Sequence, residues 1–500
     1  MSIKDGKRHL QSIKDGRTVY IDGKLAGDVT QHPAFRNAVQ STCALYDFQA
    51  HPDHQELMTF DLGNGRRVNR CWEQPRSYEQ LVQRRKALVT WAEQHHGFMG
   101  RSPDHVASAL AGQHMGIEVF RKHGEQRASA LDDYFRYARD NDLFLTYVII
   151  NPQANRAKDW GEQNKLDGGE DLVAAIVDED GEGITIRGAK MLGTSSIMAN
   201  EVFVANLQPL KKGEERLAFS CALPMNTRGL KVLSRKSYEA HAVSEYDNPL
   251  SSRFDENDAL MYFDDVKVPW DRVFVHRDTD MCRAQFHDTP GHTMQNYQAQ
   301  MRLSVKLRFL TGVARRIADT IGTSGMPAVA EQLGMLAAKS AMVESMMWGM
   351  EAAGYMWGEY YMPNKHMMYT AQVITQELYP QFINTIRNLA GGSLIMLPSS
   401  VEDMLNPELA GIVRKTQVSQ AMGPDSRVKF LKLAWDAIGS EFASRHLQYE
   451  MFYAGAQFVT CGHSFRTYDW NGATSLTDAL MNSYDTPGVQ AQAAKKVANA

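Results

Sequence analysis

The hydrophobic periodicity changes twice along this 500-residue chain, and these changes constrain the fold more than any single motif does. Over the first ~145 residues, apolar side chains recur at helical spacing. Between Leu81 and Ala92, for example, the pattern follows a capping residue, Ser77, and ends at Gly97. From Thr146 the pattern changes to short β-branched runs separated by turn residues. The expected strands are 146–150, 172–177, 183–187, 201–204, 217–223 and 260–268.

Long amphipathic segments return after Gln295 and predict four helices, which favour a bundle. The expected helices are 296–321, 327–356, 370–390 and 424–453. We therefore expect an α+β fold that is mostly α. Its parts are an N-terminal helical domain (1–145), a middle β-barrel domain (146–280), a C-terminal four-helix bundle (281–460) and a C-terminal tail (461–500). This order of parts resembles that of the acyl-CoA dehydrogenase-like flavoproteins.

The composition argues against several classes of protein. The 54 basic and 58 acidic residues nearly balance and form no long run of like charge, so we expect no nucleic-acid or membrane partner. The chain has no apolar stretch of spanning length and no signal-peptide core at its start, which predicts a cytoplasmic protein. Its 5 cysteines are scattered without a C-x-x-C pair, and His51, His54, His95 and His96 lack a third ligand at useful spacing. We expect no disulfide and no metal site.

The segment Gly100–Ala107 contains the start of a helix with unusual polar neighbours. Ser102 suits the N-cap position, Pro103 the first helical position and Asp104 the first turn. Arg101 and His105 would then lie close to the free backbone N–H groups of that end, where an anionic oxygen can bind. Taken alone, the same residues also fit a surface arginine and a packing histidine.

Seven segments in the same order resemble one family, the 4-hydroxyphenylacetate 3-monooxygenase oxygenase components and their chlorophenol and nitrophenol monooxygenase relatives. These segments are Asp15–Arg17, Thr30–Asn37, Gly100–Asp104, Asn151–Pro152 with Arg156, Arg187–Lys190, Pro249–Ala259, and Leu431–Phe442 with Arg445.

The resemblance implies a homotetramer that binds FAD as FADH2, supplied by a separate NAD(P)H:flavin reductase, with O2 as co-substrate. In that chemistry a flavin C4a-hydroperoxide transfers oxygen to a phenol ortho to its hydroxyl group and gives a catechol. One independent observation agrees with a separate source of electrons. The chain has no G-x-G-x-x-G motif opening a βαβ unit, so it lacks the fingerprint of a nicotinamide site.

Three residues correspond to the family's phenol site. Arg101 matches the arginine that binds the phenolic oxygen, whereas His105 and Tyr147 stand where the 4-hydroxyphenylacetate enzymes have a tyrosine and a histidine, so the two ring types are exchanged. Forming phenolate at neutral pH from a phenol with a pKa near 10 costs roughly 4 kcal/mol. An arginine and a neutral imidazole can supply such stabilisation, and we expect His105 to be the proton acceptor.

The resemblance also assigns candidate flavin residues. Gln153 and Arg156 follow the strand that packs on the isoalloxazine, and Thr194 or Ser195 belongs to the segment whose hydroxyl reaches flavin N5. Arg445 and the pair Gly391 and Gly392 are further candidates. The loop 208–216 occupies the position of the family's substrate lid.

Three alternative functions remain. A 4-hydroxybutyryl-CoA dehydratase-like lyase needs a C-x-x-x-C near Gly97 that is absent, and an acyl-CoA dehydrogenase gives the Arg101 segment no role. A non-catalytic scaffold of the same fold is the third. The halophenol branch uses a histidine where this chain places Asn296 or Gln298, which argues against dehalogenation. The particular phenol, 4-hydroxyphenylacetate-like, tyrosine-derived or simpler, is left open.

Overall fold

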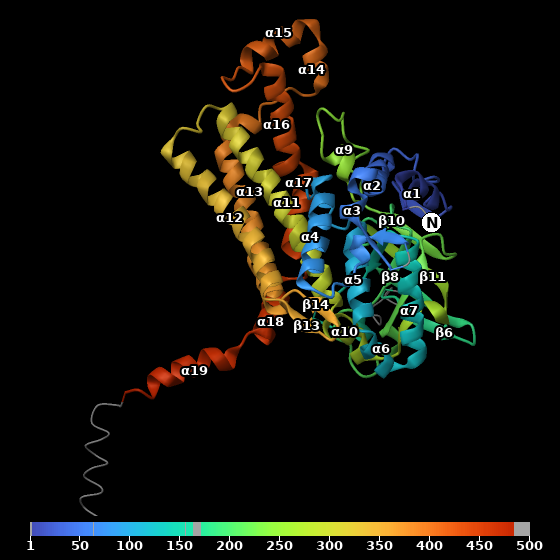
Figure 1. Ribbon diagram of the computed structural model, residues 1–500. Helices are drawn as coiled ribbons and strands as arrows, with labels where there is room; N and C mark the ends of the chain where they lie inside the picture. The colour runs from blue at the N-terminus through green and yellow to red at the C-terminus, as the bar shows by residue number, and fades with distance from the viewer. Residues whose placement is uncertain (1–2, 64, 156, 164–171, 485–500) are drawn as a thin grey trace, which may run out of the picture.

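The computed structural model describes residues 3–63, 65–155, 157–163 and 172–484, and its three parts lie side by side (Figure 1). A bundle of long helices stands beside a smaller body in which N-terminal helices pack against a β unit. The expected α+β architecture, mostly α, is therefore confirmed.

The N-terminal part is mainly helical, as its periodicity predicts. Ser77 caps the fourth helix by accepting a hydrogen bond from the Gln80 N–H, and the chain leaves that helix through Gly97 in the left-handed region, with φ of 75°. The helices are α1 (Gly6–Ser12), α2 (Arg36–Ala50), α3 (Pro52–Met58), α4 (Tyr78–Glu93), α5 (Pro103–Met115), α6 (Ile117–His123) and α7 (Glu125–Asp140); a small hairpin joins β3 (Thr59–Asp61) to β4 (Arg67–Asn69).

The expected β-barrel takes the form of two sheets that enclose one apolar core. One sheet has the order β2 (Lys24–Leu25), β1 (Thr18–Ile21), β10 (Leu230–Ser234), β11 (Ala259–Pro269), β7 (Gly183–Lys190) and β6 (Ala175–Glu179). The other has the order β12 (Val273–His276), β9 (Phe219–Pro224), β8 (Glu201–Val204) and β5 (Leu145–Val148).

Four of these strands were not expected from the sequence: β1, β2, β10 and β12. The first two come from the N-terminal segment, and β1 pairs in parallel with β10 across more than 200 residues of chain. Residues 18–25 therefore belong to the β unit, although they lie within the segment 1–145 that was expected to form the helical domain. A pairing partner this distant leaves no local signal, and strands of two to five residues are too short to show a clear alternation.

The C-terminal bundle contains α11 (Gly291–Thr320), α12 (Pro327–Ala352), α13 (Lys365–Ala390), α16 (Pro424–Ile438) and α17 (Glu441–Phe452). The single helix expected over 424–453 is wrong, because Gly439 ends α16 and the Ser440 hydroxyl caps α17 by accepting from the Ala443 N–H. The helix expected over 327–356 also stops early, at a hairpin of β13 (Tyr355–Trp357) and β14 (Tyr360–Met362).

Shorter helices surround the bundle. They are α10 (Thr279–His287), α14 (Val401–Leu405), α15 (Pro407–Thr416), α18 (Gln457–Thr467) and α19 (Trp470–Met481). α14 and α15 cap one end, whereas α18 leads to α19, which projects away from the body (Figure 1). None of the described helices combines the length and the apolar composition needed to cross a bilayer.

A buried carboxylate links the bundle helices to the N-terminal part. Glu450 on α17 binds Arg302 and Lys306 on α11, with Nη2–Oε2 at 2.8 Å and Nζ–Oε1 at 3.0 Å, and all three side chains are buried. Arg302 also donates to the carbonyl of Gly97. Burial alone would raise the pKa of Glu450, but the two cations lower it to about 2.

Removing that carboxylate should destabilise the fold strongly, because it leaves two cations buried without their partner. We expect Glu450→Ala to cost about 3–5 kcal/mol, seen as a large fall in melting temperature. The control Glu441→Ala removes an exposed partner of Lys236 and should cost under about 1 kcal/mol. Equal melting temperatures for the two variants would contradict the assigned role of Glu450.

Candidate active site

Arg101 lies immediately before α5, as the helix-start pattern predicts. Ser102 is the N-cap residue and Pro103 the first helical residue, but the Ser102 hydroxyl donates to the Asp104 carboxylate at 2.5 Å instead of capping a backbone N–H. The Arg101 guanidinium is buried and donates to the Tyr449 hydroxyl at 2.7 Å and to the Tyr453 carbonyl at 3.2 Å. Arg101 is therefore a buried cation of the candidate site and not a surface arginine.

His105 is held in one orientation by two glutamines of α11. The Gln298 Nε2 donates to Asp104 at 3.1 Å, so its Oε1 faces the His105 Nδ1 at 2.8 Å and requires a proton there. The His105 Nε2 then carries a lone pair, and the Gln295 Nε2 donates to this nitrogen at a distance of 3.1 Å. Burial, and secondly the Arg101 cation, lower the pKa of His105 well below its usual range, so the ring is neutral.

Tyr147 on β5 completes the predicted trio. Its ring stacks on the His105 ring at 5.7 Å between centroids, and the Arg101 guanidinium carbon lies 5.4 Å from the Tyr147 ring centroid. A small, largely apolar cavity adjoins the pair. It is lined by Val106, Ala109, Leu110, Gln113, Tyr147, Phe203, Phe286 and Gln295. Residues 46 positions apart in sequence thus form one aromatic and cationic cluster beside an apolar pocket.

Thr194 and Ser195 lie in a strained turn after β7. Ser195 has φ of 63°, an uncommon conformation for a residue with a side chain, and its N–H donates to the carbonyls of Glu256 and Asn257. The Thr194 hydroxyl donates to Asp258 at 2.6 Å, which leaves its oxygen able to accept. The buried hydroxyls of Ser195 and Ser196 have no partner among the described residues.

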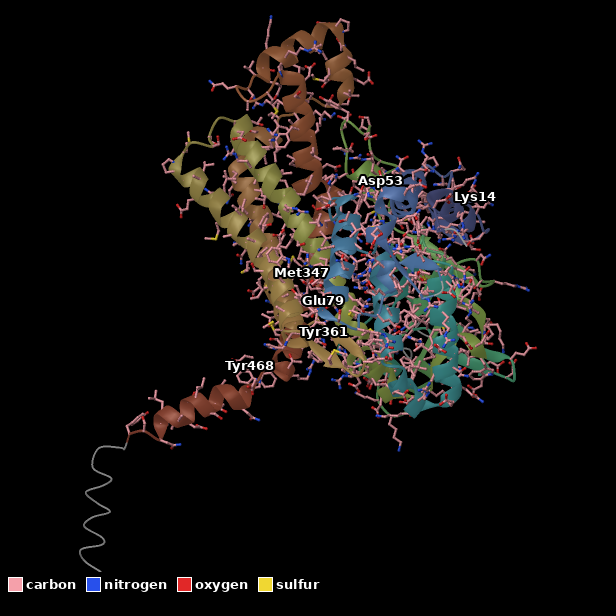
Figure 2. The ribbon with its side chains drawn as sticks, in the orientation of Figure 1. Lys14, Asp53, Glu79, Met347, Tyr361 and Tyr468 are labelled. Atoms are coloured by element: carbon pink, nitrogen blue, oxygen red, sulfur yellow. The ribbon has the colours of Figure 1, made fainter. Side chains whose placement is uncertain are left out.

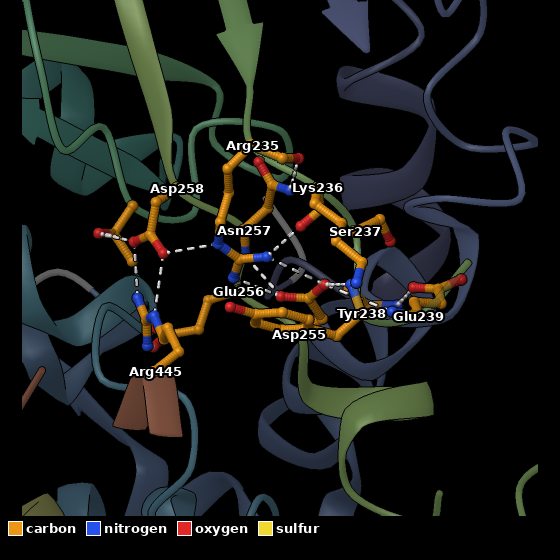
Figure 3. A network of polar contacts seen from close by, with 12 residues as sticks. Arg235, Lys236, Ser237, Tyr238, Glu239, Asp255, Glu256, Asn257, Asp258 and Arg445 are labelled. Atoms are coloured by element: carbon orange, nitrogen blue, oxygen red, sulfur yellow. Dashed lines mark hydrogen bonds and ion pairs between the residues drawn. The ribbon is translucent and has the colours of Figure 1, made fainter. Parts of the chain in front are cut away.

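Two carboxylates, Glu256 and Asp258, connect the Thr194 turn to Arg101. Figure 3 shows Arg445 beside Asp258. Arg445 donates to Asp258 at 2.6 and 2.9 Å and to Glu256 at 2.6 Å, while the second oxygen of Glu256 accepts from the Arg101 backbone N–H at 2.7 Å. Burial alone would raise the pKa of Asp258, but Arg445 and Arg235 lower it, so the carboxylate stays ionised.

Gln153 follows β5 with its Oε1 buried, and neither this atom nor the buried Nδ2 of Asn151 has a partner among the described residues. The Asn151 oxygen accepts from the buried ammonium of Lys190 at 2.6 Å, which fixes this segment. Together with the Ser195 and Ser196 hydroxyls, these atoms can bind a large polar group, as a flavin requires. Arg156 lies outside the described residues.

Gly391 and Gly392 are not brought into this cluster. They form an exposed 3-10 turn, η4 (Gly391–Leu394), that packs against α16 beyond the end of α13. In the part of the chain that the structure describes, no hydrogen bond of the Arg101 and Arg445 network reaches them. Within one chain they remain separate from the other predicted residues.

Five residues of the site were not singled out from the sequence as site residues: Asp104, Glu256, Asp258, Gln298 and Tyr449. Glu256 and Asp258 lie in the segment Pro249–Ala259 that carries the family resemblance. The sequence therefore marked this segment but assigned no function to either carboxylate. Gln298 was considered only as a replacement for a histidine. Tyr449 follows Arg445 by one helical turn, and nothing local distinguishes it from a packing tyrosine.

Comparisons with known proteins identify the family of the chain. The family models described as 4-hydroxyphenylacetate 3-hydroxylase N terminal and C terminal match residues 5–275 and 282–482. The 4-hydroxyphenylacetate 3-monooxygenase oxygenase component of Pseudomonas aeruginosa is 34% identical over 97% of this chain and 93% of its own. The oxygenase component of 4-nitrophenol 2-monooxygenase from a Rhodococcus species is 32% identical, with 97% and 93% covered.

Solved structures extend the comparison. The oxygenase component of 4-hydroxyphenylacetate 3-monooxygenase, complexed with FAD and 4-hydroxyphenylacetate, superposes with a TM-score of 0.90 at 29% identity, covering 96% of this chain and 98% of the other. An archaeal 4-hydroxybutyryl-CoA dehydratase from N. maritimus has a TM-score of 0.86 at 19% identity over 97% and 96%, which indicates a shared fold alone. The resemblance found in the sequence is confirmed: the chain belongs to the 4-hydroxyphenylacetate 3-hydroxylase family and is an oxygenase component of the flavin-dependent aromatic monooxygenases.

Proposed function

We propose that this protein hydroxylates a 4-substituted phenol ortho to its hydroxyl group and gives a catechol, using O2 and FADH2 supplied by a separate NAD(P)H:flavin reductase. The observation that carries this proposal is the neutral His105, whose acceptor nitrogen lies in the same cluster as the buried Arg101 cation, beside a largely apolar pocket. A proton acceptor and a nearby cation both favour the phenolate form of a phenol at neutral pH.

Arg101 would bind the phenolic oxygen and stabilise its developing negative charge. Burial alone would lower the pKa of Arg101, yet Tyr147, Tyr449 and Glu256 raise it, so the guanidinium stays protonated. Because the site is buried, its charge acts through a medium of lower dielectric constant than water. Arg101 is therefore the electrostatic part of the phenol site.

His105 would accept the phenolic proton at Nε2. The relay from Asp104 through Gln298 keeps the ring proton on Nδ1 and so keeps the accepting lone pair on the opposite nitrogen. For a phenol to approach, it must take the place of the Gln295 amide at that nitrogen. Tyr147 would position the substrate ring against the same cluster.

The flavin, when bound with O2, supplies the oxygen atom that is transferred. Gln153, Ser195 and Thr194 would hold it, because the first two offer buried polar atoms without partners and Thr194 offers an acceptor oxygen. Arg445 would act through Asp258, whose carboxylate accepts a hydrogen bond from the Thr194 hydroxyl and so orients the oxygen of that hydroxyl. Arg156, Gly391 and Gly392 remain proposed flavin contacts on the resemblance alone.

The alternative lyase function fits these residues poorly. A cysteine-ligated iron–sulfur cluster needs several thiolates close together. Among the described residues, the groups of three or more potential ligands that lie close enough for a metal comprise one set of histidines and contain no cysteine.

The direct test is product analysis with FAD, a flavin reductase, NADH and a panel of 4-substituted phenols. The wild-type enzyme should form catechols, and His105→Ala should lower the rate of hydroxylation about 10²–10³-fold, the usual range for a lost general base. Tyr147→Phe keeps the ring stack and should lose less than about tenfold. No catechol from any phenol would overturn the proposed function; an unchanged His105→Ala beside an inactive Tyr147→Phe would reverse the roles of the two residues.

The pH dependence of kcat/KM provides a second prediction. Since burial and Arg101 lower the pKa of His105, its accepting nitrogen stays unprotonated well into acid. The activity should therefore show no loss through about pH 6.5, where an unperturbed histidine gains its proton. A protonation step centred there, seen in a profile measured from pH 5.5 to 8.5, would contradict His105 as the buried acceptor.

We also propose that the protein is a cytoplasmic homotetramer. The tetramer rests on the family resemblance and on apolar surfaces that one chain leaves uncovered. α19 exposes Leu476, Leu480 and Met481, and Figure 2 places Tyr468 where this helix departs from the body. An isolated helix of 12 residues is marginal in water and needs a partner surface. Another copy of the chain would provide it.

Introducing negative charges at the exposed apolar positions of α19 should therefore dissociate the tetramer. The double variant Leu476→Glu, Leu480→Glu should shift the mass measured by light scattering after gel filtration from four chains to fewer. The matched control Leu25→Glu, Val243→Glu places the same charges at equally exposed apolar sites and should leave four chains. A wild-type protein that is monomeric, or a control that dissociates equally, would contradict this assembly.

A further inference from the structure

We infer that His287, His292 and His463 form a binding site for one divalent transition-metal ion of the zinc class. Their ligating atoms all lie within 4.8 Å of one another, although the residues come from α10, α11 and α18. The ring centroids are 4.7, 4.9 and 5.4 Å apart. Zn–N bonds of about 2.0–2.1 Å place neighbouring nitrogens about 3.4 Å apart, so closing the site needs movements of about 1.4 Å at most.

The three rings lie away from bulk solvent: His292 and His463 are buried, and His287 is partly buried. A neutral imidazole binds a metal ion through the lone pair of one ring nitrogen.

Tyr369 on α13 lies at the edge of the three rings. Its hydroxyl oxygen is 3.3 Å from the His292 Nδ1 and 3.5 Å from the His287 Nδ1, and its ring stacks on His463. Burial raises the pKa of Tyr369, so it stays a neutral phenol. It would orient the histidines, and water would complete a tetrahedral site.

The surrounding charges decide which metal fits. The groups that act electrostatically on the three rings include the cations Arg283, Lys365 and Arg466. An uncharged ligand set among cations cannot hold Mg²⁺ or Ca²⁺, which need anionic oxygen ligands. Zn²⁺, Ni²⁺ and Cu²⁺ bind imidazole strongly enough to occupy an uncharged histidine site of this kind.

Arg466 would compete with the metal. Its Nη2 donates to the His463 Nδ1 at 2.7 Å, which places the proton of the neutral ring on Nε2. To bind a metal, His463 must release this contact, and Arg466 is exposed and can turn into solvent. The arginine thus weakens the site without blocking it.

The site would brace a wall of the small apolar cavity beside Tyr147. Phe286 and Gln295, which line that pocket, are next to His287 and one turn after His292 respectively. The metal would join this wall to α18, the helix from which α19 departs. No local spacing reveals the site, because the third histidine lies more than 170 residues after the first two.

The test is titration of the metal-free, tag-free full chain with Zn²⁺ alone, in competition with a chromophoric chelator. Wild-type protein should bind one Zn²⁺ per chain, and His463→Gln should bind it at least about tenfold more weakly. Arg466→Gln should bind it more tightly than wild type. Co²⁺ should give the intense visible bands of a tetrahedral site in wild type and lose them in His463→Gln.

The control variant His51→Ala, His54→Ala removes two neighbouring histidines that belong to no group of three potential metal ligands among the described residues, and it should leave the Zn²⁺ affinity unchanged. Melting temperatures without metal would verify that each variant folds, and Zn²⁺ should raise the melting temperature of wild type but not of His463→Gln. Absence of Zn²⁺ binding by wild type, or equal binding by wild type and His463→Gln, would overturn the site.

Discussion

The Glu256 carboxylate is the interaction on which the arrangement of the active site depends. One oxygen accepts from the Arg101 backbone N–H and the other from Arg445, so the start of α5, the loop before β11 and α17 meet at one residue. These segments come from all three parts of the fold. Because the carboxylate is buried, its bonds to the two arginines are charge-assisted and directional, and they fix the position of Arg101 relative to the Thr194 turn.

Burial also sets the charges of the reacting groups. In water a histidine next to an arginine would differ little from any other histidine, but here desolvation and Arg101 together keep His105 neutral while Arg101 stays protonated. The pair therefore combines a cation with a proton acceptor at short range. Burial acts in the same way on the proposed metal ligands His287, His292 and His463, whose pKa values it also lowers.

Local sequence patterns predicted the elements that carry their own signals. The helix start at Ser102 and Pro103 and the strand at 201–204 were expected where the structure has them. The break between α16 and α17 was missed, although glycine commonly ends helices and serine commonly caps their starts. The apolar spacing continues through Gly439 and Ser440 and hides the break. β1 was missed because its partner strand β10 lies more than 200 residues away, and β2, which pairs with β1, is too short to show alternation.

The sequence by itself determined the family and the reaction class, because ordered motifs are tied to the chemistry of particular residue types, and it singled out Arg101, His105 and Tyr147 as candidate site residues. Only the tertiary structure decided how these three side chains lie and which partners they contact. The proton on His105 is placed by Gln298 and Asp104, and the acceptor oxygen of Thr194 is freed by Asp258. Such roles depend on contacts between distant segments and on the exclusion of water, and neither is a property of any local stretch of chain.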